Sequence, residues 1–342
     1  MRPLQAVRRS LLPLVPAYRL ALAFRELRLR SGMEAVRRLR SPVISIGNLS
    51  TGGTGKTPFT IALAGALGRR RVRVDVLSRG YGRQSRLPAL VRMGGTAAEF
   101  GDEPLLIARE AGVPVYVAAR RYDAGVLAEQ NERAGSGLSP DMPLVHLLDD
   151  GFQHRQLHRD IDILLLNRQD WHDSLLPAGN LREPHQSARR ATIFAVPFEE
   201  PELEAELRAW GWQGPVWRLH RRMEVPRIAG PIAAFCGIAR PGQFFAGVEA
   251  AGLHIATRTA FPDHHRYVPH DIDCLLAAAR TVGATALVTT EKDLARLGDL
   301  ISSFPESLPL KIARLCIEIE DEAAVLEGLM SRLRSVSPQP AL

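Results

Sequence analysis

A glycine-rich turn with one lysine joins two apolar runs in "VISIGNLSTGGTGKTPFTIALAGAL", residues 43–67. Binding a nucleotide requires backbone N–H groups that converge on phosphate oxygens, a lysine for the outer phosphates and a hydroxyl for Mg²⁺, all at the start of a helix. Lys56 and Thr57 fit the last two roles, and the chain has only three lysines. A plain turn between a strand and a helix is the alternative. The predicted nucleotide-binding loop consists of Ser50, Thr51, Gly52, Gly53, Thr54, Gly55, Lys56 and Thr57.

Two aspartates end the apolar run of "PLVHLLDDGFQHRQL". Phosphate-loop proteins use an acidic residue at such a strand end to hold Mg²⁺ beside the loop threonine. A helix cap is the alternative for one aspartate, but it explains two adjacent ones less well. We therefore predict a magnesium site formed by Thr57, Asp149 and Asp150, with Gln153 and His154 close by.

Two more polar clusters stand at the boundaries of predicted elements. In "VDVLSRGYGR" a strand leads directly into Arg79 and Tyr81, where the glycines permit a tight turn. In "EFGDEPLLIARE" Asp102 and Glu103 precede a helix, and acidic residues there are stabilising caps. Turn chemistry and capping are therefore alternatives to a functional role for both clusters.

The segment "FPDHHRYVPHDID" contains Asp263, His264 and His265, which are residue types that bind metals. Adjacent histidines rarely point to one centre, and no third ligand follows at i+4, so the spacing argues against a metal site. The cysteines are three and widely spaced, which predicts a reducing compartment without disulfides or a zinc site. They are Cys236, Cys274 and Cys316.

The positive charge of the chain is concentrated near its N-terminus. The net charge is +7, but residues 1–40 hold ten arginines and two glutamates, so the other 302 residues carry −1. This distribution argues against a nucleic-acid-binding protein, in which the folded domain should be basic. Helical spacing places Leu20, Phe24 and Leu27 on one face, as in a helix that lies on an anionic membrane. Packing on the protein's own core is the alternative, and no run is long enough to span a bilayer.

Short apolar runs alternate with helical patterns from residue 43 onward, and this alternation restarts after residue 228. Repeated strand–helix units with almost continuously apolar strands predict an α/β fold with a doubly wound, mostly parallel sheet. We predict an N-terminal membrane-associating helix (1–40), a P-loop domain (41–216), a short β connector (217–227) and a smaller α/β domain (228–342).

Eight motifs together resemble the tetraacyldisaccharide 4'-kinase family, which is the lipid A 4'-kinase family. In chain order they are "GNLSTGGTGKTP", "SRGYGR", "GDEP", "DDGFQH", "LLPAGNLREP", "FCGIARPGQFF", "FPDHHRY" and "TTEKD". The resemblance extends from the N-terminal helix to about residue 297. The family's loop also has serine at the position of Ser50, where the strict pattern G-x-x-x-x-G-K-[ST] has glycine.

The resemblance implies transfer of the ATP γ-phosphate to the 4'-hydroxyl of a tetraacylated glucosamine disaccharide 1-phosphate, with ATP and Mg²⁺ bound. It implies that Asp102 is the base toward the acceptor hydroxyl, that His264 pairs with it and that Lys56 serves the phosphates. Further candidates for substrate contacts, or for support of the residues that make them, are Arg79, Tyr81, Glu103, Gln153, His154, Arg182 and Glu183.

An acylated substrate leaves a bilayer only at about 0.8 kcal/mol per buried methylene, so the enzyme is expected to come to the membrane. The resemblance places it as a peripheral protein on the cytoplasmic face of the inner membrane of a Gram-negative bacterium. The predicted partners are the lipid substrate and an anionic membrane surface, and the sequence indicates neither nucleic acid nor an obligate protein partner.

Two other functions use similar features. A membrane-recruited switch ATPase of the partitioning type has a "GGxGKT" loop, but it carries a signature lysine where Thr51 stands here. A soluble small-molecule kinase, whose N-terminal helix only packs on the core, is the second alternative.

Overall fold

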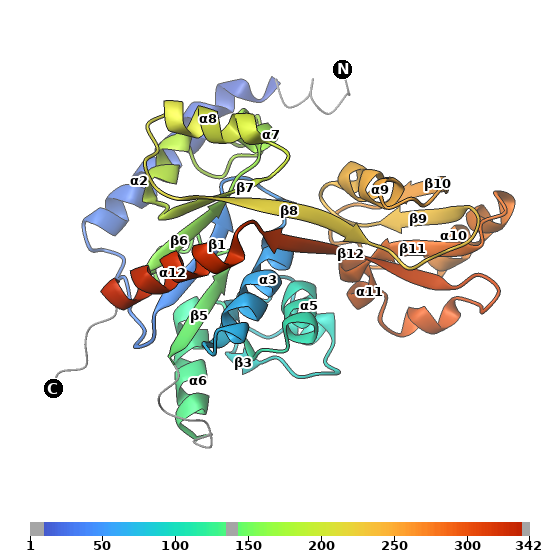
Figure 1. The fold of residues 1–342 in the computed structure, drawn as a ribbon, viewed down its shortest axis with the longest axis horizontal. Helices are drawn as coiled ribbons and strands as arrows, with labels where there is room; N and C mark the ends of the chain where they lie inside the picture. Colours follow the sequence, from blue (N-terminus) through green and yellow to red (C-terminus); the bar gives the residue numbers. More distant parts are fainter. Residues whose placement is uncertain (1–9, 135–142, 337–342) are drawn as a thin grey trace.

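The computed structural model describes residues 10–134 and 143–336, and twelve strands of these residues form one sheet (Figure 1). The strand order is β10-β9-β11-β12-β8-β7-β6-β1-β5-β2-β4-β3. Within the described residues, neighbouring strands are parallel except for the pairs β12/β8 and β3/β4. The strands are β1 (Val43–Asn48), β2 (Arg73–Ser78), β3 (Ala89–Leu90), β4 (Val115–Val117), β5 (Leu144–Asp149), β6 (Ile161–Leu165), β7 (Ile193–Pro197), β8 (Val216–Glu224), β9 (Ile232–Cys236), β10 (Ile255–Ala260), β11 (Ala286–Thr290) and β12 (Leu310–Ile319). The predicted α/β fold with a large, mostly parallel sheet is confirmed.

Helices connect the strands, as expected for parallel strands that need crossover connections. The α-helices are α2 (Val15–Arg30), α3 (Lys56–Arg69), α4 (Ala97–Phe100), α5 (Asp102–Ala111), α6 (Arg121–Ala134), α7 (Arg168–Trp171), α8 (Pro201–Ala209), α9 (Pro241–Ala250), α10 (Pro269–Thr281), α11 (Glu291–Leu297) and α12 (Glu322–Val336). Short 3₁₀ helices are η1 (Leu12–Leu14), η2 (His185–Arg190) and η3 (Gly298–Ser303).

The antiparallel strands β8 and β12 connect the two ends of the sheet (Figure 1). Residues Val216 to Leu219 of β8 pair with β7, and its later residues pair with β12, where Leu219 lies opposite Ile319. We call the part of the sheet formed by β8, β7, β6, β1, β5, β2, β4 and β3 the larger end. The part formed by β10, β9, β11 and β12 is the smaller end. The predicted connector at 217–227 falls on β8, whereas its partner β12 was not predicted as part of it. The exact domain boundaries stay a prediction.

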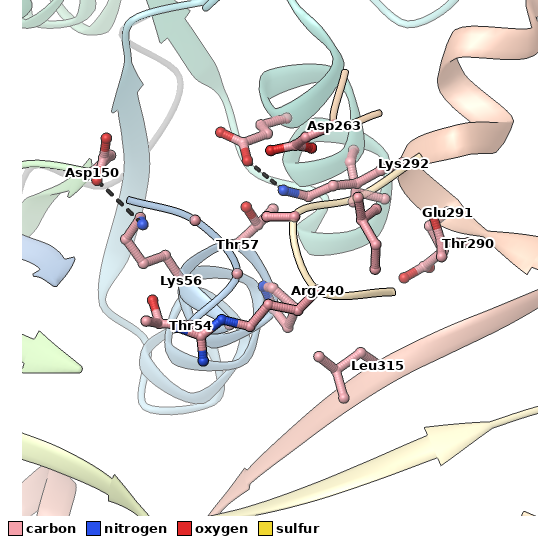
Figure 2. Close-up of a pocket in the computed structure, with 18 of the residues that line it drawn as sticks. Thr54, Lys56, Thr57, Asp150, Arg240, Asp263, Thr290, Glu291, Lys292 and Leu315 are labelled. Atoms are coloured by element: carbon pink, nitrogen blue, oxygen red, sulfur yellow. Dashed lines mark hydrogen bonds and ion pairs between the residues drawn. The ribbon is translucent and has the colours of Figure 1, made fainter. Parts of the chain in front are cut away.

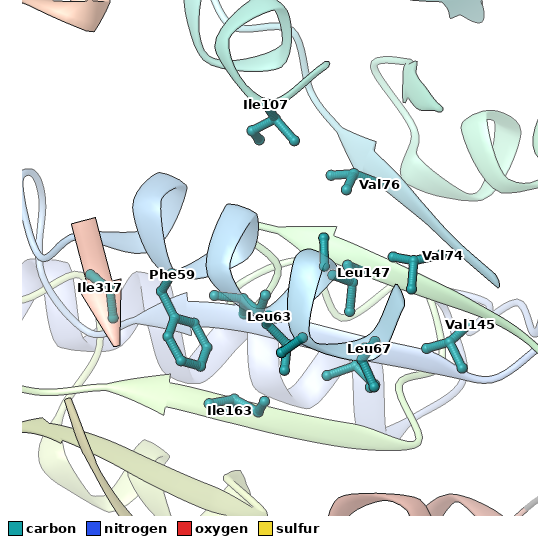
Figure 3. Close-up of a cluster of buried hydrophobic side chains, with 14 of the residues drawn as sticks. Phe59, Leu63, Leu67, Val74, Val76, Ile107, Val145, Leu147, Ile163 and Ile317 are labelled. Carbon is teal, nitrogen blue, oxygen red and sulfur yellow. The ribbon is translucent and has the colours of Figure 1, made fainter. Parts of the chain in front are cut away.

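Helix α3 forms the centre of the core of the larger end (Figure 3). Its Phe59, Leu63 and Leu67 are fully buried against side chains of β2, β5 and β6. Burial of each such side chain contributes about 1.5–3 kcal/mol. Ile317 of β12 and the apolar face of α12 belong to the same cluster. The sequence predicts that the residues of α12 belong to the smaller domain, but the buried leucines of this helix pack beside α3 because β12 returns the chain to the larger end.

A buried ionic network fixes β5 inside the sheet. His146 of β5 is fully buried, and its Nδ1 lies 2.6 Å from Asp75 of β2. Its Nε2 lies 3.6 Å from Glu129 of α6, which also accepts hydrogen bonds from the backbone N–H groups of Arg40 and Ser41. Burial alone would lower the pKa of His146, but the two carboxylates outweigh it and raise this pKa to about 9. The imidazolium therefore ties β5 to β2 and to the segment that enters β1.

Helix α2 packs on the protein by one face and exposes another. Val15, Tyr18 and Leu22 pack against the core cluster that contains β7 and α8. Leu20 and Phe24 of the predicted apolar stripe are 71% and 62% exposed. Core packing and an exposed apolar stripe therefore coexist on different faces of this helix. In the described residues, no helix is long and apolar enough to cross a membrane.

Candidate active site

A cavity of about 550 Å³ lies between the larger and the smaller end of the sheet, directly over the glycine-rich loop (Figure 2). Ligands of doubly wound sheets collect beyond the carboxyl ends of the strands, where β1, β2 and β5 end here. Most of the predicted site residues line this cavity. They are Thr51, Gly52, Gly53, Thr54, Gly55, Lys56, Thr57, Arg79, Tyr81, Glu103, Asp149, Asp150, Arg182 and His264.

The glycine-rich loop adopts a conformation that requires glycine. Gly52 and Gly55 have φ angles of 97° and 90°, in the left-handed region that side chains disfavour. Helix α3 begins at Lys56, so its free N–H groups and the positive end of its dipole face the cavity. The Lys56 Nζ donates to Asn48 Oδ1 at 3.0 Å and lies 3.4 Å from Asp150 Oδ1 (Figure 2). These features make the loop a binding site for an anion such as a phosphate.

Ser50 does not line the cavity, but it anchors the loop from below. Its Oγ donates to Asp170 Oδ2 at 2.8 Å and accepts from Asn48 Nδ2 at 3.1 Å. Ser50 and Asp170 are both buried. A glycine at this position could not make these bonds, which explains why the departure from the strict loop pattern is tolerated.

The two adjacent aspartates have opposite electrostatic environments. Asp149 is buried, and burial together with the charges of Glu103 and Asp150 raises its pKa to about 7. Burial acts in the same direction on Asp150, but Lys56 and Arg182 outweigh it and hold the pKa of Asp150 well below its usual value. Asp150 is thus neutralised by cations of the protein, whereas the surroundings of Asp149 disfavour its ionised form.

This contrast fits a site for Mg²⁺ in which Asp149 is the better ligand. In the part of the chain that the structure describes, no group of three His, Cys, Asp or Glu side chains could hold a metal alone. Mg²⁺ beside nucleotides usually takes only one or two carboxylates and completes its shell with phosphates and water. Thr57 and Asp149 line the same cavity and match this pattern, and a divalent cation would favour the ionised form of Asp149.

Asp102 is held by residues from both ends of the sheet. Asp102 is the first residue of α5, and its Oδ1 accepts from the backbone N–H of Glu103 at 3.0 Å. Its Oδ2 accepts from Arg296 Nε at 2.7 Å and lies 3.4 Å from His264 Nδ1. Burial favours the neutral acid, but His264, Arg296 and Lys292 outweigh it, so the pKa of Asp102 is well below its usual value. The contact within α5 and the contacts with the smaller end thus use different oxygens of one carboxylate.

His264 is the member of this pair that faces the cavity. Asp102 is 6% exposed and does not line the cavity, whereas the side chain of His264 is 39% exposed and does. The hydrogen bond to Asp102 raises the pKa of His264. The ring of Tyr81 lies beside the imidazole, with centroids 5.2 Å apart. Gly101 lets these segments approach, because a Cβ there would lie 3.0 Å from the carbonyl oxygen of Tyr81.

An ion pair between Glu103 and Lys292 forms part of the cavity wall. Glu103 belongs to the first turn of α5 in the larger end, and Lys292 belongs to the first turn of α11 in the smaller end. The charge of Lys292 lowers the pKa of Glu103 more than burial raises it. Together with the contact between Arg296 and Asp102, this pair joins the two ends by ionic contacts.

Four other predicted residues lie behind the cavity wall rather than in it. Gln153 donates to the carbonyl of Asn48 at 2.9 Å and accepts from Arg182 of the wall at 3.3 Å. His154 does not reach the cavity, and burial beside arginines lowers its pKa to about 3. Glu183 is buried in an ion pair with Arg190. Ser50, described above, is the fourth.

Several cavity residues were not predicted from the sequence. Arg121 begins α6, lines the cavity and is 6% exposed, and burial lowers its pKa to about 10. Arg221 and Arg240 line the cavity from β8 and from the loop after β9. Arg296 was not predicted either: it does not line the cavity but binds Asp102 behind it, and its place one helical turn after Lys292 was the only available signal.

Comparison with known proteins shows one consistent family. The family model described as tetraacyldisaccharide-1-P 4'-kinase matches residues 7–334. The chain is 42% identical over 304 residues to the tetraacyldisaccharide 4'-kinase of Koribacter versatilis, covering 86% of this chain and 89% of that protein. It is 36% identical over 328 residues to the enzyme of that name from Aquifex aeolicus, covering 90% and 96% respectively.

A solved structure is also similar over nearly the whole chain. The crystal structure of the "apo" form of LpxK from Aquifex aeolicus in complex with ATP superimposes with a TM-score of 0.72 and 32% sequence identity. The match covers 96% of this chain and 99% of that one. The likeness therefore extends over nearly the whole length of both chains.

Proposed function

Because the chain belongs to the tetraacyldisaccharide-1-P 4'-kinase family, we propose that it transfers the γ-phosphate of ATP to the 4'-hydroxyl of a tetraacylated glucosamine disaccharide 1-phosphate. The product is the bis-phosphorylated lipid A precursor. The observation that carries this proposal is the cavity that brings Lys56 of the phosphate loop and His264 of the Asp102 pair together. A phosphate donor and a hydroxyl acceptor would meet there.

The phosphate loop positions the donor. Lys56 holds the outer phosphates, and the N–H groups at the start of α3 hold the oxygens that the lysine does not reach. On arrival of ATP, Lys56 exchanges its contact with Asp150 for the phosphates, and Arg182 keeps Asp150 neutralised. Bound Mg²⁺, held by Thr57 and Asp149, would supply neutralisation of the charge on the outer phosphates.

Asp102 and His264 act on the acceptor as one unit. The imidazole at the cavity wall meets the 4'-hydroxyl, and the carboxylate behind it stabilises the charge of the proton that is taken up. A strong base is not needed, because the transition state of phosphoryl transfer is loose and depends mainly on positioning. The low pKa of Asp102 is compatible with this role, since it keeps the carboxylate ionised.

The N-terminal helix brings the enzyme to its substrate. The exposed side chains of Leu20, Phe24 and Leu27 form an apolar face on α2, with arginines on the same helix. Such a face suits insertion at the boundary between the headgroups and acyl chains of an anionic membrane. We place the protein as a peripheral enzyme on the cytoplasmic face of the inner membrane of a Gram-negative bacterium.

The decisive experiment uses γ-labelled ATP, Mg²⁺ and the purified disaccharide 1-phosphate lipid in detergent. We expect a doubly phosphorylated lipid with the wild-type chain and only background product with Lys56→Ala. ATP hydrolysis without any labelled lipid would contradict the proposal and favour the switch ATPase. Labelling of a soluble sugar with no labelling of the lipid would favour the small-molecule kinase.

A further inference from the structure

The loop after β9 lies directly on the phosphate loop. A Cβ on Gly52 would be 2.8 Å from the Cβ of Ala239, and a Cβ on Gly53 would be 3.1 Å from Cγ of Arg240. The smaller end of the sheet thus supplies a segment that covers the middle of the phosphate loop. In Figure 2 the side chain of Arg240 extends along this loop toward Thr54.

The guanidinium of Arg240 is only partly neutralised there. Its Nη2 forms an ion pair with Asp170, which is 2% exposed and is the carboxylate that accepts from Ser50. Its Nη1 is buried and has no hydrogen-bond partner in the described residues. A buried donor without a partner costs free energy, so this nitrogen is free to bind an acceptor that enters the site.

A second arginine increases the positive charge at the same place. Arg221 of β8 lies with Nη2 3.7 Å from the position of a Cβ on Gly55, and it lines the same cavity. Among the described residues its side chain forms no ion pair or hydrogen bond. Burial and the charge of Arg240 both lower its pKa, more than Glu199 and Glu200 raise it. Arg221 thus adds a second guanidinium beside the phosphate loop, and of the two only Arg240 forms an ion pair in the described residues, with Asp170.

This surplus of positive charge calls for an anion, and the glycine-rich loop below it is built for phosphates. Lys56 approaches the outer phosphates from the floor of the site, whereas Arg240 lies across Gly53 from the opposite end of the sheet. In phosphate-loop enzymes, an arginine that enters over this loop stabilises the charge that develops on the transferred phosphoryl group.

We propose that Arg240 is an arginine finger supplied in cis by the smaller end of the sheet, and that it contacts the γ-phosphoryl oxygens of ATP. Asp170 is its positioning partner, because it joins the finger to Ser50 and hence to the phosphate loop. No bond is made or broken by the finger itself. This inference rests on the proposed function in that the nucleotide is the phosphate donor.

The test compares Arg240→Ala and Arg240→Lys with the matched control Arg222→Ala. Arg222 of β8 is 64% exposed and pairs with Glu224 and Glu318 away from the loop. We expect kcat of Arg240→Ala to fall roughly 10³-fold, and Arg240→Lys to recover only part of it, since lysine lacks the planar fork. The control should match the wild type.

Calorimetry with ADP alone and with ADP plus aluminium fluoride, which mimics the transferred phosphoryl group, gives a readout that needs no lipid. Arg240→Ala should bind ADP normally and lose most of its affinity for the aluminium fluoride complex. Equal weakening of both ligands, or unchanged kcat, would overturn the finger. If Arg240→Ala melts well below the wild type, Arg240→Lys decides by the same two measurements. A wild-type chain that binds both ligands but makes no labelled lipid would instead count against the proposed function.

Discussion

Replacing Asp102 by asparagine separates the catalytic role of this residue from its structural role. The substituted amide keeps the shape of the side chain and an oxygen for the backbone N–H of Glu103, so this contact in the first turn of α5 remains. It presents a neutral group to Arg296, whose side chain is 6% exposed. Asp102→Asn therefore removes both the carboxylate that supports proton uptake by His264 and the partner of a buried cation.

The two losses have different magnitudes. Removal of a group that takes part in general base catalysis lowers kcat by about 10²–10⁴. Breaking a buried ion pair costs about 3–5 kcal/mol. Arg296 keeps contacts to Asp293 and to the carbonyl of Gly237, so the lower end of this range applies. A loss of about 3 kcal/mol lowers Tm by roughly 4 °C in a chain of this length, if it unfolds as one unit.

A second substitution distinguishes the two effects. In Asp102→Asn combined with Arg296→Met, the uncompensated charge is gone, so Tm should return toward that of the wild type. Activity should stay low, because the carboxylate is still missing. The assays are labelled-lipid formation at saturating substrates and thermal unfolding. If the double variant regains both Tm and kcat, the loss in Asp102→Asn is structural and the catalytic assignment is wrong.

Three further outcomes are expected. Lys56→Ala should lower kcat/KM for labelled-lipid formation by several decades, because no other described residue places an ammonium at the start of α3. Near-normal turnover would mean that the phosphate loop is not the nucleotide site. Leu20→Ser and Phe24→Ser should each weaken binding to anionic vesicles roughly tenfold without a change in Tm, because both side chains are exposed. Val282→Ser, at an exposed residue of the smaller end, is the control. Full vesicle binding by the variant with both substitutions in α2 would place the membrane contact elsewhere. The folded-state pKa of His146 is above the unfolded value of about 6.5, so its contribution, on the order of 3 kcal/mol, is complete below that pH and lost as pH rises through about 9. Urea unfolding at pH 6 and 9.5 should show this loss in the wild type and not in His146→Gln, and equal pH dependence of the two proteins would refute it.

Local sequence patterns predicted those parts of the candidate site that consist of one short, continuous segment. The loop around Lys56 and the strand end at Asp149 were found because strand, turn chemistry and helix start follow one another in the chain. The pairing of Asp102 with His264 came only from the resemblance. Since 162 positions separate these two residues, no local pattern links them.

Long-range contacts explain what the sequence analysis missed. Arg240 and Arg296 belong to the smaller end, and their contacts with the larger end depend on how the pairing of β8 with β12 places the two ends. The packing of α12 beside α3 has the same origin, because an antiparallel pair between distant strands leaves no periodic signal. The face by which α2 contacts the protein could not be predicted either, since an amphipathic pattern does not specify what covers each face.

The pairing of β8 with β12 also sets the order in which the protein can fold during synthesis. By the end of β8 all strands of the larger end have been made, but Ile317 of β12 and the leucines of α12 that cover α3 follow about a hundred residues later. At 5–20 residues per second this delay lasts roughly 5–20 s. During that time the apolar surface of α3 lacks part of its cover, and the smaller end has time to form as a unit. A nascent chain stalled after β11 should therefore be cleaved near α3 by a protease that spares the finished protein, and the emerging larger end should be a substrate for chaperones.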